Sequence, residues 1–373
     1  MQQEKLLLIL HYSPPVHGAA KVGDTILNSS ILGANFKRKY IKLESSKNIK
    51  TIGKFQFKKI LLLIQLFSKV LYNLFFFRPK KIYFTASPKG FAFYRDLIVM
   101  MPIKCYAKIT NCEIFLHYHA IGINDFCNQS SFKRKLANFF VSKTNIILIS
   151  KKIKAEISQL DSYKKEFFLE NGVKNHLTEK QFSVILEERK KSKKYNVLFL
   201  SNMIKTKGYD DVLELANQLK NKNYNDINFH FAGSWSSDND ELFFKNFIKD
   251  NNLEDCVKFH GFVAKKAKEK LISEANIFIF PTRYDKEVFP LSILEALSYG
   301  LPILAYNKGA VSDIVDDKVG IITNKTSFFD DFLILKNKNI NNDVYLASRE
   351  KYLKNYTLAS FEKKLLSILK NEC

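Results

Sequence analysis

Short apolar runs alternate with helical patterns along this chain of 373 residues, and the alternation occurs twice. The runs are rich in Ile, Leu and Phe and are bounded by polar turns, which is typical of buried strands. They cover residues 5–10, 81–87, 112–120 and 145–150 in the first half, and 196–201, 228–233, 257–262, 276–281 and 302–307 in the second. The helical patterns lie at 54–77, 91–108, 130–142, 208–220, 239–251, 264–274, 290–299 and 309–316. Strands that alternate with helices predict parallel, doubly wound sheets, so we expect an α/β chain.

The alternation stops and restarts near the middle of the chain, which predicts two Rossmann-like domains. Residues 179–194 are dense in charge and are the expected linker. We therefore place an N-terminal domain at 1–178 and a C-terminal domain at 195–345. Residues 346–373 carry another helical pattern, which we expect to pack back toward the N-terminal domain. Ligands of such open sheets bind outside the carboxyl ends of the strands, here in a cleft between two facing domains.

The composition limits the partners and the compartment. The formal net charge of +22 favours anionic partners, such as nucleotides, nucleic acid or an anionic membrane surface. An AT-rich genome would also enrich Lys, Asn, Ile and Phe together, so the charge alone does not establish a partner. The five cysteines are scattered and show no CxxC or Cys/His zinc spacing, which is typical of free thiols in a reducing compartment. No signal-peptide pattern is visible at the N-terminus, so we expect a cytoplasmic protein.

One apolar segment, residues 60–77, raises the question of a membrane. Its 18 residues are near the lower limit for a spanning helix, and Gln65, Ser68, Lys69 and Asn73 interrupt it at roughly helical spacing. The pattern therefore favours an amphipathic helix that packs on a sheet. A helix face that touches a membrane surface is the main alternative, and a true span is a remote one.

Two acids lie close to a predicted helix start in "RYDKEVFPLSILEALSYGLPI", residues 283–303. Glu287 lies in the loop, Pro290 suits the first turn, and Glu295 lies in the second turn of a helix that ends at Gly300. The free N–H groups and the dipole of a helix start attract anions. Two acids beside an anion site suit a nucleoside diphosphate sugar, with phosphates at the helix and hydroxyls on the acids. Spacing alone leaves open that both are ordinary surface acids.

Several segments, taken in order, resemble the family 4 glycosyltransferases of the GT-B fold. The E-x7-E pattern of Glu287 and Glu295, with Phe289 after the first acid and "EAL-x-x-G-x-P-I" around the second, carries the resemblance most strongly. Other matching segments are "HYSPPVHGAAKVG" (11–23), "ENGV" (170–173), "SNMIKTKGYDDVLELA" (201–216), "FHFAGSW" (229–235), "VKFHGFV" (257–263) and "KGAVSDIV" (308–315). The resemblance implies two Rossmann-like domains that face each other across a cleft, with the donor domain at the C-terminal end.

The resemblance assigns the donor contacts of the helix start. Glu295 would hold the ribose hydroxyls and Glu287 would contact the transferred sugar. The backbone amides of Leu291 and Ser292 would hold the diphosphate. Pro290 stands where the family more often has glycine and removes one possible amide donor, and Phe289 and Pro290 complete this part of the donor site.

The resemblance also assigns the positive charge that the leaving group needs. Lys207 would match the basic residue of the family's "KG" and would neutralise the departing diphosphate as a point charge. The family's arginine falls at Asn202, which departs from the pattern. Lys205 is the candidate to replace that charge. For Lys207 alone, a solvated loop lysine is the alternative.

Two histidines and a glycine complete the set in the first domain. His117 and His119 alternate along a predicted strand and so point to one face. The family has a histidine near the transferred sugar, and His119 matches it best, with His117 as second choice; a metal site lacks an evident third ligand. Gly18 follows the first strand, where the family's glycine loop lies near the donor phosphate and the acceptor.

The resemblance implies a retaining hexosyltransferase that acts by a front-face mechanism. No Asp-x-Asp motif stands at the end of a predicted strand, so we expect no metal requirement. The donor would be a nucleoside diphosphate sugar, and the acceptor a lipid-linked glycan of O-antigen, capsule or lipopolysaccharide synthesis. Basic residues of the first domain suit a peripheral protein on the inner face of the bacterial plasma membrane. Two rivals remain: a UDP-sugar epimerase of the same architecture, and a nucleic-acid-binding protein, although no nucleic-acid-binding motif is present.

Overall fold

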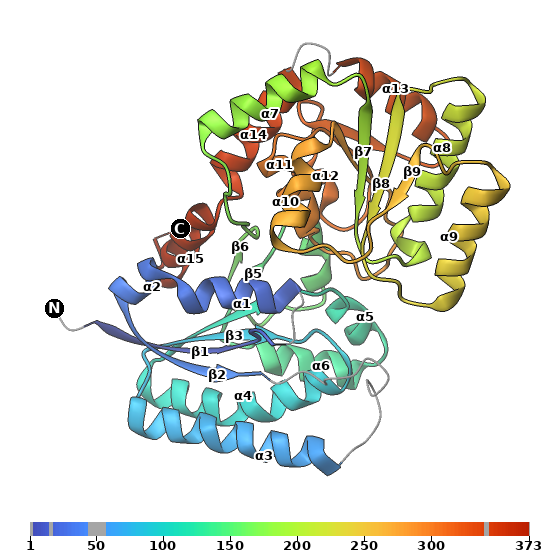
Figure 1. Cartoon of the computed structure of the whole chain (residues 1–373). Helices are drawn as coiled ribbons and strands as arrows, with labels where there is room; N and C mark the ends of the chain where they lie inside the picture. Colours follow the sequence, from blue (N-terminus) through green and yellow to red (C-terminus); the bar gives the residue numbers. More distant parts are fainter. Residues whose placement is uncertain (1–2, 15–17, 44–56, 339–342, 373) are drawn as a thin grey trace. The chain divides into compact units, whose positions relative to one another are not determined.

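The computed structural model describes residues 3–14, 18–43, 57–338 and 343–372, with 57–59 described in their backbone only. The chain forms two compact units (Figure 1). Unit 1 holds residues 1–171 and 358–373, and unit 2 holds residues 172–357. The boundary therefore lies seven residues earlier than the sequence placed it.

Unit 1 is built on a parallel sheet of six strands among the described residues. The strand order is β2-β1-β3-β4-β5-β6. The strands are β1 (Glu4–Leu10), β2 (Phe36–Lys42), β3 (Lys81–Ala86), β4 (Glu113–Tyr118), β5 (Asn145–Leu148) and β6 (Lys165–Phe168). The middle strands β1, β3, β4 and β5 are almost wholly buried, which explains their continuous apolar sequences.

Helices cover both faces of this sheet. They are α1 (Gly18–Asn28), α2 (Ser30–Asn35), α3 (Phe57–Tyr72) with a π-helix at Asn73–Phe77, α4 (Gly90–Thr110), α5 (Ile123–Asn128), α6 (Ser131–Val141), a 3-10 helix at Lys151–Ile157 and α15 (Leu358–Lys370). Leu8 and its neighbour Tyr83 share a core cluster with Leu365 of α15. On the opposite face, Phe84 of β3 packs edge-on against Phe140 of α6.

The apolar segment 60–77 is the end helix of this second face. By length and composition it could cross a membrane, and 22% of it is buried. Leu66, Val70, Leu74 and Phe77 are buried at helical spacing, so one side of the segment packs on unit 1. The expected packing on the sheet through one side is therefore confirmed, whereas the other side is more apolar than an amphipathic helix predicts.

Unit 2 repeats the same plan with the strand order β12-β11-β10-β7-β8-β9 among the described residues. The strands are β7 (Tyr195–Leu200), β8 (Ile227–Ala232), β9 (Val257–Phe259), β10 (Ile277–Phe280), β11 (Ile303–Tyr306) and β12 (Gly320–Thr323), all parallel. Its helices are α7 (Glu179–Lys191), a 3-10 turn at Lys205–Lys207, α8 (Tyr209–Asn221), α9 (Asp238–Asp250), α10 (Lys265–Glu274), α11 (Leu291–Ser298), α12 (Val311–Ile314), α13 (Phe328–Lys338) and α14 (Asp343–Asn355).

The predicted linker 179–194 is wrong, because most of it is helix α7 of unit 2. Thr178 and Gln181 form a capping box at its start. Phe182 and Leu186 pack with Tyr345 of α14, and the buried Arg189 donates to the backbone carbonyl oxygens of α10 and of Tyr299. The apolar and arginine contacts make this charged segment part of the unit 2 core.

The C-terminal segment 346–373 divides between the units. Its first part belongs to α14 of unit 2, where Arg349 donates to the carbonyl oxygens of Ser298 and Leu177. Its second part is α15, whose Phe361, Ile368 and Leu369 lie in the core cluster of unit 1. The single predicted helix is therefore two helices, and α15 packs on the N-terminal sheet as expected.

Candidate functional site

Lys207 and Glu287 meet at the carboxyl edge of the unit 2 sheet. Lys207 ends the 3-10 turn after β7, and Glu287 lies in the loop after β10, the neighbouring strand. The Lys207 Nζ donates to Glu287 Oε2 at 2.5 Å, and the two side chains are only 14% and 10% exposed. The same ammonium lies 4.6 Å from the ring centroid of Tyr284. The two residues, 80 positions apart, thus form a nearly buried ion pair where open α/β sheets bind ligands.

Gly208 and Arg283 fix the turn that carries Lys207. Gly208 has a φ of +87°, and a Cβ there would lie 2.2 Å from the carbonyl oxygen of Pro281. The Arg283 N–H donates to Thr206 O at 2.7 Å, and its guanidinium binds Asp210 and Asp211 of α8. Sequence reasoning did not assign Arg283, although it begins the stretch that carries both acids. Its partners lie more than 70 residues away, so only the fold shows its function as a positioning residue.

Replacing Gly208 should both destabilise unit 2 and displace Lys207. We expect Gly208→Ala to cost more than about 2 kcal/mol, since the left-handed backbone alone costs about 1–2 kcal/mol and the Pro281 backbone must also move. Gly261→Ala is the matched control, because its φ is +64° but nothing lies within 4 Å of the added Cβ. Thermal and denaturant unfolding measure both. Equal losses in the two variants would contradict the close contact with Pro281.

The Glu287 loop is held by the loop that follows β11. Gly309 has a φ of +59°, and a Cβ there would lie 2.4 Å from the carbonyl oxygen of Glu287. The Ala310 N–H donates to Val288 O at 2.8 Å. This glycine belongs to the "KGAVSDIV" segment, so the segment positions the acid through its backbone.

Helix α11 starts directly after this loop. Pro290 is its N-cap and makes no side-chain cap hydrogen bond, and Leu291 and Ser292 are half-buried in its first turn. The first N–H groups of a helix have no partner within the helix and carry its positive end. Phe289 is 7% exposed and its ring packs near Tyr356, so its side chain belongs to the core beside the site.

Glu295 is paired with a second lysine that sequence reasoning missed. Lys268 of α10 donates from Nζ to Glu295 Oε1 at 2.7 Å, and the side chains are 25% and 20% exposed. Each acid of the E-x7-E pattern is therefore matched by its own lysine. Lys268 lies in a lysine-rich helix whose spacing gives no signal that distinguishes it from its neighbours.

Lys205 and Asn202 do not join these pairs. The Lys205 ammonium lies 4.8 Å from the ring centroid of Phe243 on α9, whereas that of Lys207 lies against Glu287. Asn202 is exposed in the loop after β7. Two lysines of one short turn thus contact different elements.

In unit 1, the two predicted histidines lie together at the end of β4. His117 is wholly buried and shares a 2.6 Å hydrogen bond between its Nδ1 and the Tyr83 hydroxyl. Its ring centroid lies 3.9 Å from that of the half-buried His119. Burial, and then the neighbouring His119, hold the pKa of His117 well below its usual value, so His117 is neutral. Of the two, His119 is the one that solvent can reach.

Gly18 begins α1, and nothing lies within 4 Å of a Cβ added there. The glycine that packing requires in this helix is Gly23, whose Cβ would lie 1.7 Å from His11 O. Residues 15–17 of the predicted glycine loop lie outside the described residues. Sequence reasoning selected Gly18 and missed Gly23. The missing side chain of Gly23 lets α1 lie against the end of β1.

Two further features set limits on the site. Among the described residues, no group of three His, Cys, Asp or Glu side chains could hold a metal ion. A hollow of about 640 Å³ lies between α7 and α10, and its lining, which includes His176 and Tyr299, contains none of the predicted site residues.

Comparisons with known proteins show what this chain is similar to. Residues 183–332 match the family model of "Glycosyl transferases group 1", which covers most of unit 2 and both lysine–acid pairs. The chain is 32% identical over 79 residues to the amylovoran biosynthesis glycosyltransferase AmsK of Erwinia amylovora. That match covers 20% of this chain and spans about a fifth (19%) of AmsK.

Two solved structures show the fold over the whole chain. A glycosyltransferase from Rickettsia africae superposes with a TM-score of 0.69 at 15% identity and covers 100% of this chain and 99% of its own. HepE of Anabaena, in complex with UDP and glucose, gives a TM-score of 0.65 at 15% identity and covers 99% of this chain and 100% of its own. The fold is thus the GT-B architecture of two six-stranded α/β units, and the group 1 domain supports a transferase enzyme.

Proposed function

We propose that this chain is a retaining glycosyltransferase of family 4 that moves a sugar from a nucleoside diphosphate sugar to a hydroxyl of a glycan acceptor. The observation that carries the proposal is the Lys207–Glu287 pair beside the start of α11, within the group 1 glycosyltransferase domain. Cation, acid and helix start are the three elements that a diphosphate sugar requires in one place.

The donor contacts follow from the charges of this edge. The diphosphate binds the amides of Leu291 and Ser292 at the positive end of α11. The ribose hydroxyls bind Glu295, and the hydroxyls of the transferred sugar bind Glu287. Two carboxylates near a diphosphate would repel it, since like charges 4 Å apart cost about 4 kcal/mol at an effective dielectric constant of 20. Lys207 and Lys268 offset that repulsion, because each neutralises one acid.

The reaction proceeds by a front-face mechanism. The bond between the anomeric carbon and the phosphate oxygen breaks, and the acceptor oxygen bonds to the same face of that carbon. The acceptor proton passes to the departing phosphate oxygen. The Lys207 ammonium pairs with Glu287 when the donor binds and shifts toward the phosphate as negative charge grows there. Together with the α11 dipole it stabilises that charge electrostatically.

The remaining contacts belong to unit 1 and to the turn after β7. The assignments of His119 to the transferred sugar and of the Gly18 backbone to the donor phosphate stay predictions from the resemblance. Lys205 and Asn202 border the donor without contacting the leaving phosphate, because the Lys205 ammonium lies on Phe243.

The acceptor is a lipid-linked glycan in the synthesis of a surface polysaccharide, at the cytoplasmic face of the plasma membrane. The match to a protein of amylovoran biosynthesis supports the polysaccharide, and the net charge of +22 supports an anionic membrane. The comparisons favour neither the epimerase nor the nucleic-acid-binding alternative.

Thermal-shift measurements with UDP, GDP and their sugars, followed by turnover with a polyprenyl-linked acceptor, test the proposal. We expect one nucleotide to raise the unfolding temperature and the product to keep the anomeric configuration of the donor. Inversion of that configuration would exclude the front-face mechanism. Interconversion of a free UDP-sugar without any acceptor would favour the epimerase.

Removal of metal ions should leave turnover unchanged. We expect full activity in excess EDTA, because the ammonium of Lys207 and the helix start supply the positive charge that a divalent ion supplies elsewhere. Initial rates with EDTA and with added Mg²⁺ or Mn²⁺ measure this. A loss in EDTA that Mg²⁺ restores would show that these groups are insufficient.

A further inference from the structure

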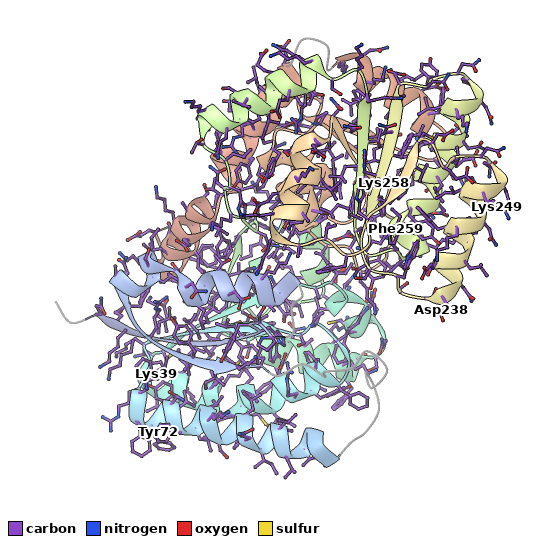
Figure 2. The ribbon with its side chains drawn as sticks, in the orientation of Figure 1. Lys39, Tyr72, Asp238, Lys249, Lys258 and Phe259 are labelled. Carbon is purple, nitrogen blue, oxygen red and sulfur yellow. The ribbon has the colours of Figure 1, made fainter. Side chains whose placement is uncertain are left out.

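The outer side of α3 and its π-helix exposes large apolar side chains. Leu61, Ile64 and Tyr72 are 54%, 57% and 62% exposed, and the adjacent Phe75 and Phe76 are 71% and 73% exposed. These residues lie opposite the buried stripe that begins at Leu66, and Figure 2 shows Tyr72 projecting from the outer side of α3. The helix is therefore packed on unit 1 through one side and presents apolar side chains on the other.

Helix α4 exposes a second apolar stripe. Phe91, Tyr94, Ile98, Met101 and Ile109 are 37% to 83% exposed and recur every three or four residues apart from one gap. Cys105, which fills that gap, is also exposed. The regular spacing places all of them on one side of the helix.

The two stripes belong to one surface, which we call the α3–α4 face. Helices α3 and α4 contact each other (Figure 1). Lys5 of β1 lies over the ring of Phe77, and Phe93 of α4 contacts Phe140 of α6, which packs on Phe84 of β3. Lys5 and Ile9 are four positions apart on β1, so their side chains point to the same face of the sheet. Ile9 is paired with Phe84 of β3, which therefore points to that face as well. Helices α3 and α4 thus cover the same sheet face, and their outer sides point the same way.

The charge of this face has one sign. Between residues 60 and 110 the sole acid is Asp96, which is fully buried and paired with Arg95. Exposed cations border the apolar stripes; they are Lys69, Arg78, Lys80 and Lys108. An apolar surface whose two helices carry exposed cations and no exposed acid complements a layer of anionic headgroups over hydrocarbon.

We propose that the α3–α4 face docks on an anionic lipid bilayer, with α3 and α4 lying in the plane of the interface. The phenylalanines enter the boundary between headgroups and acyl chains, and the lysines bind headgroups around them. A second copy of the chain is a poor occupant, because a twofold contact would set this cationic face against itself. The proposal deepens the proposed function, since it names the surface that brings the enzyme to a lipid-linked acceptor.

Co-sedimentation with vesicles tests the proposal without sugar nucleotide, so its failure and a failure of the proposed function are distinguishable. We expect the full chain to bind vesicles that contain both phosphatidylglycerol and phosphatidylcholine. We expect it not to bind vesicles of phosphatidylcholine alone. Phe75→Ser with Phe76→Ser should weaken binding about a hundredfold, because two aromatic side chains no longer enter the bilayer. Lys69→Glu with Lys108→Glu should weaken it about tenfold or more.

Matched variants in unit 2 serve as controls. Ile334→Ser with Leu346→Ser removes two exposed apolar side chains of unit 2, 48% and 52% exposed, and should bind as wild type. Lys249→Glu with Lys338→Glu makes the same charge change away from the face and should bind as wild type. Equal unfolding temperatures establish that all variants are folded.

Three results would overturn the proposal. One is no binding to anionic vesicles at physiological salt. Another is wild-type binding by both variants of the face. The third is a dimer in sedimentation velocity that Phe75→Ser with Phe76→Ser dissociates, because a second copy would then cover the face.

Discussion

Lys207→Met should lower kcat/KM for sugar transfer by about a hundredfold to a thousandfold, the loss found when one donor to a developing negative charge is removed. The side chain keeps its length and loses its charge, so the departing phosphate keeps the α11 amides and loses its ammonium partner. Initial rates at varied donor concentration measure the effect. Because the interaction grows as the phosphate departs, we expect kcat to carry most of the loss.

Lys205→Met is the matched control for this variant. It removes the same charge from the same turn, but its ammonium lies on Phe243 and not on Glu287. We expect a change of less than about threefold, as for an exposed charge. Similar losses in both variants would mean that the turn as a whole, and not the Lys207 ammonium, neutralises the leaving group.

Glu287→Gln should reduce kcat about a hundredfold while donor binding stays the same or becomes tighter. The amide cannot match the carboxylate in holding sugar hydroxyls in the transition state. It also removes a negative charge near the diphosphate and frees Lys207 to bind it. Calorimetric donor affinities together with kcat separate the two effects.

Glu295→Gln is the matched comparison, since that acid is assigned to the ribose and is paired with Lys268. It should weaken donor binding about tenfold, the value of a charged hydrogen bond, and change kcat less. If Glu287→Gln weakens binding and Glu295→Gln lowers kcat, the two acids have been assigned in the wrong order.

The buried strands were predictable because a strand buried on both faces has a continuous apolar sequence. The central strands of both sheets carry short apolar runs such as "LLLIL" and "IFIF", bounded by polar residues. Helix α3 contains a similar run, "ILLLI", but its apolar stretch is too long for one strand. The strands missed are β2, β6 and β12, and each lies at the edge of its sheet. An edge strand has one neighbour and a wetter surface, so "FKRKYIK" reads as a charged loop.

The α7 error has a related cause. Its sequence is dominated by charge, yet Phe182, Ile185, Leu186 and Arg189 fall at helical spacing and are buried. The capping box of Thr178 and Gln181 was a readable signal of a helix start. The high density of charged residues therefore led to the prediction of a linker, although a narrow side of the helix is packed against unit 2.

The residues of the candidate site can be selected from local sequence patterns, but their contacts cannot. The spacing of Glu287 and Glu295 and the resemblance around Lys207 are local patterns. The pairing of Lys207 with Glu287 joins residues 80 positions apart, and that of Lys268 with Glu295 joins residues 27 apart. Such contacts depend on which strands are neighbours, and the order β10-β7 at the sheet centre becomes visible only in the folded unit.

Calorimetric titration of UDP and GDP into the wild-type protein, Lys207→Met and Glu295→Gln tests most directly whether the carboxyl edge of unit 2 is a donor site. We expect one nucleotide to bind the wild-type chain with one-to-one stoichiometry and to bind both variants at least about tenfold more weakly. Binding of neither nucleotide, or unchanged binding in both variants, would contradict a donor site built on these residues.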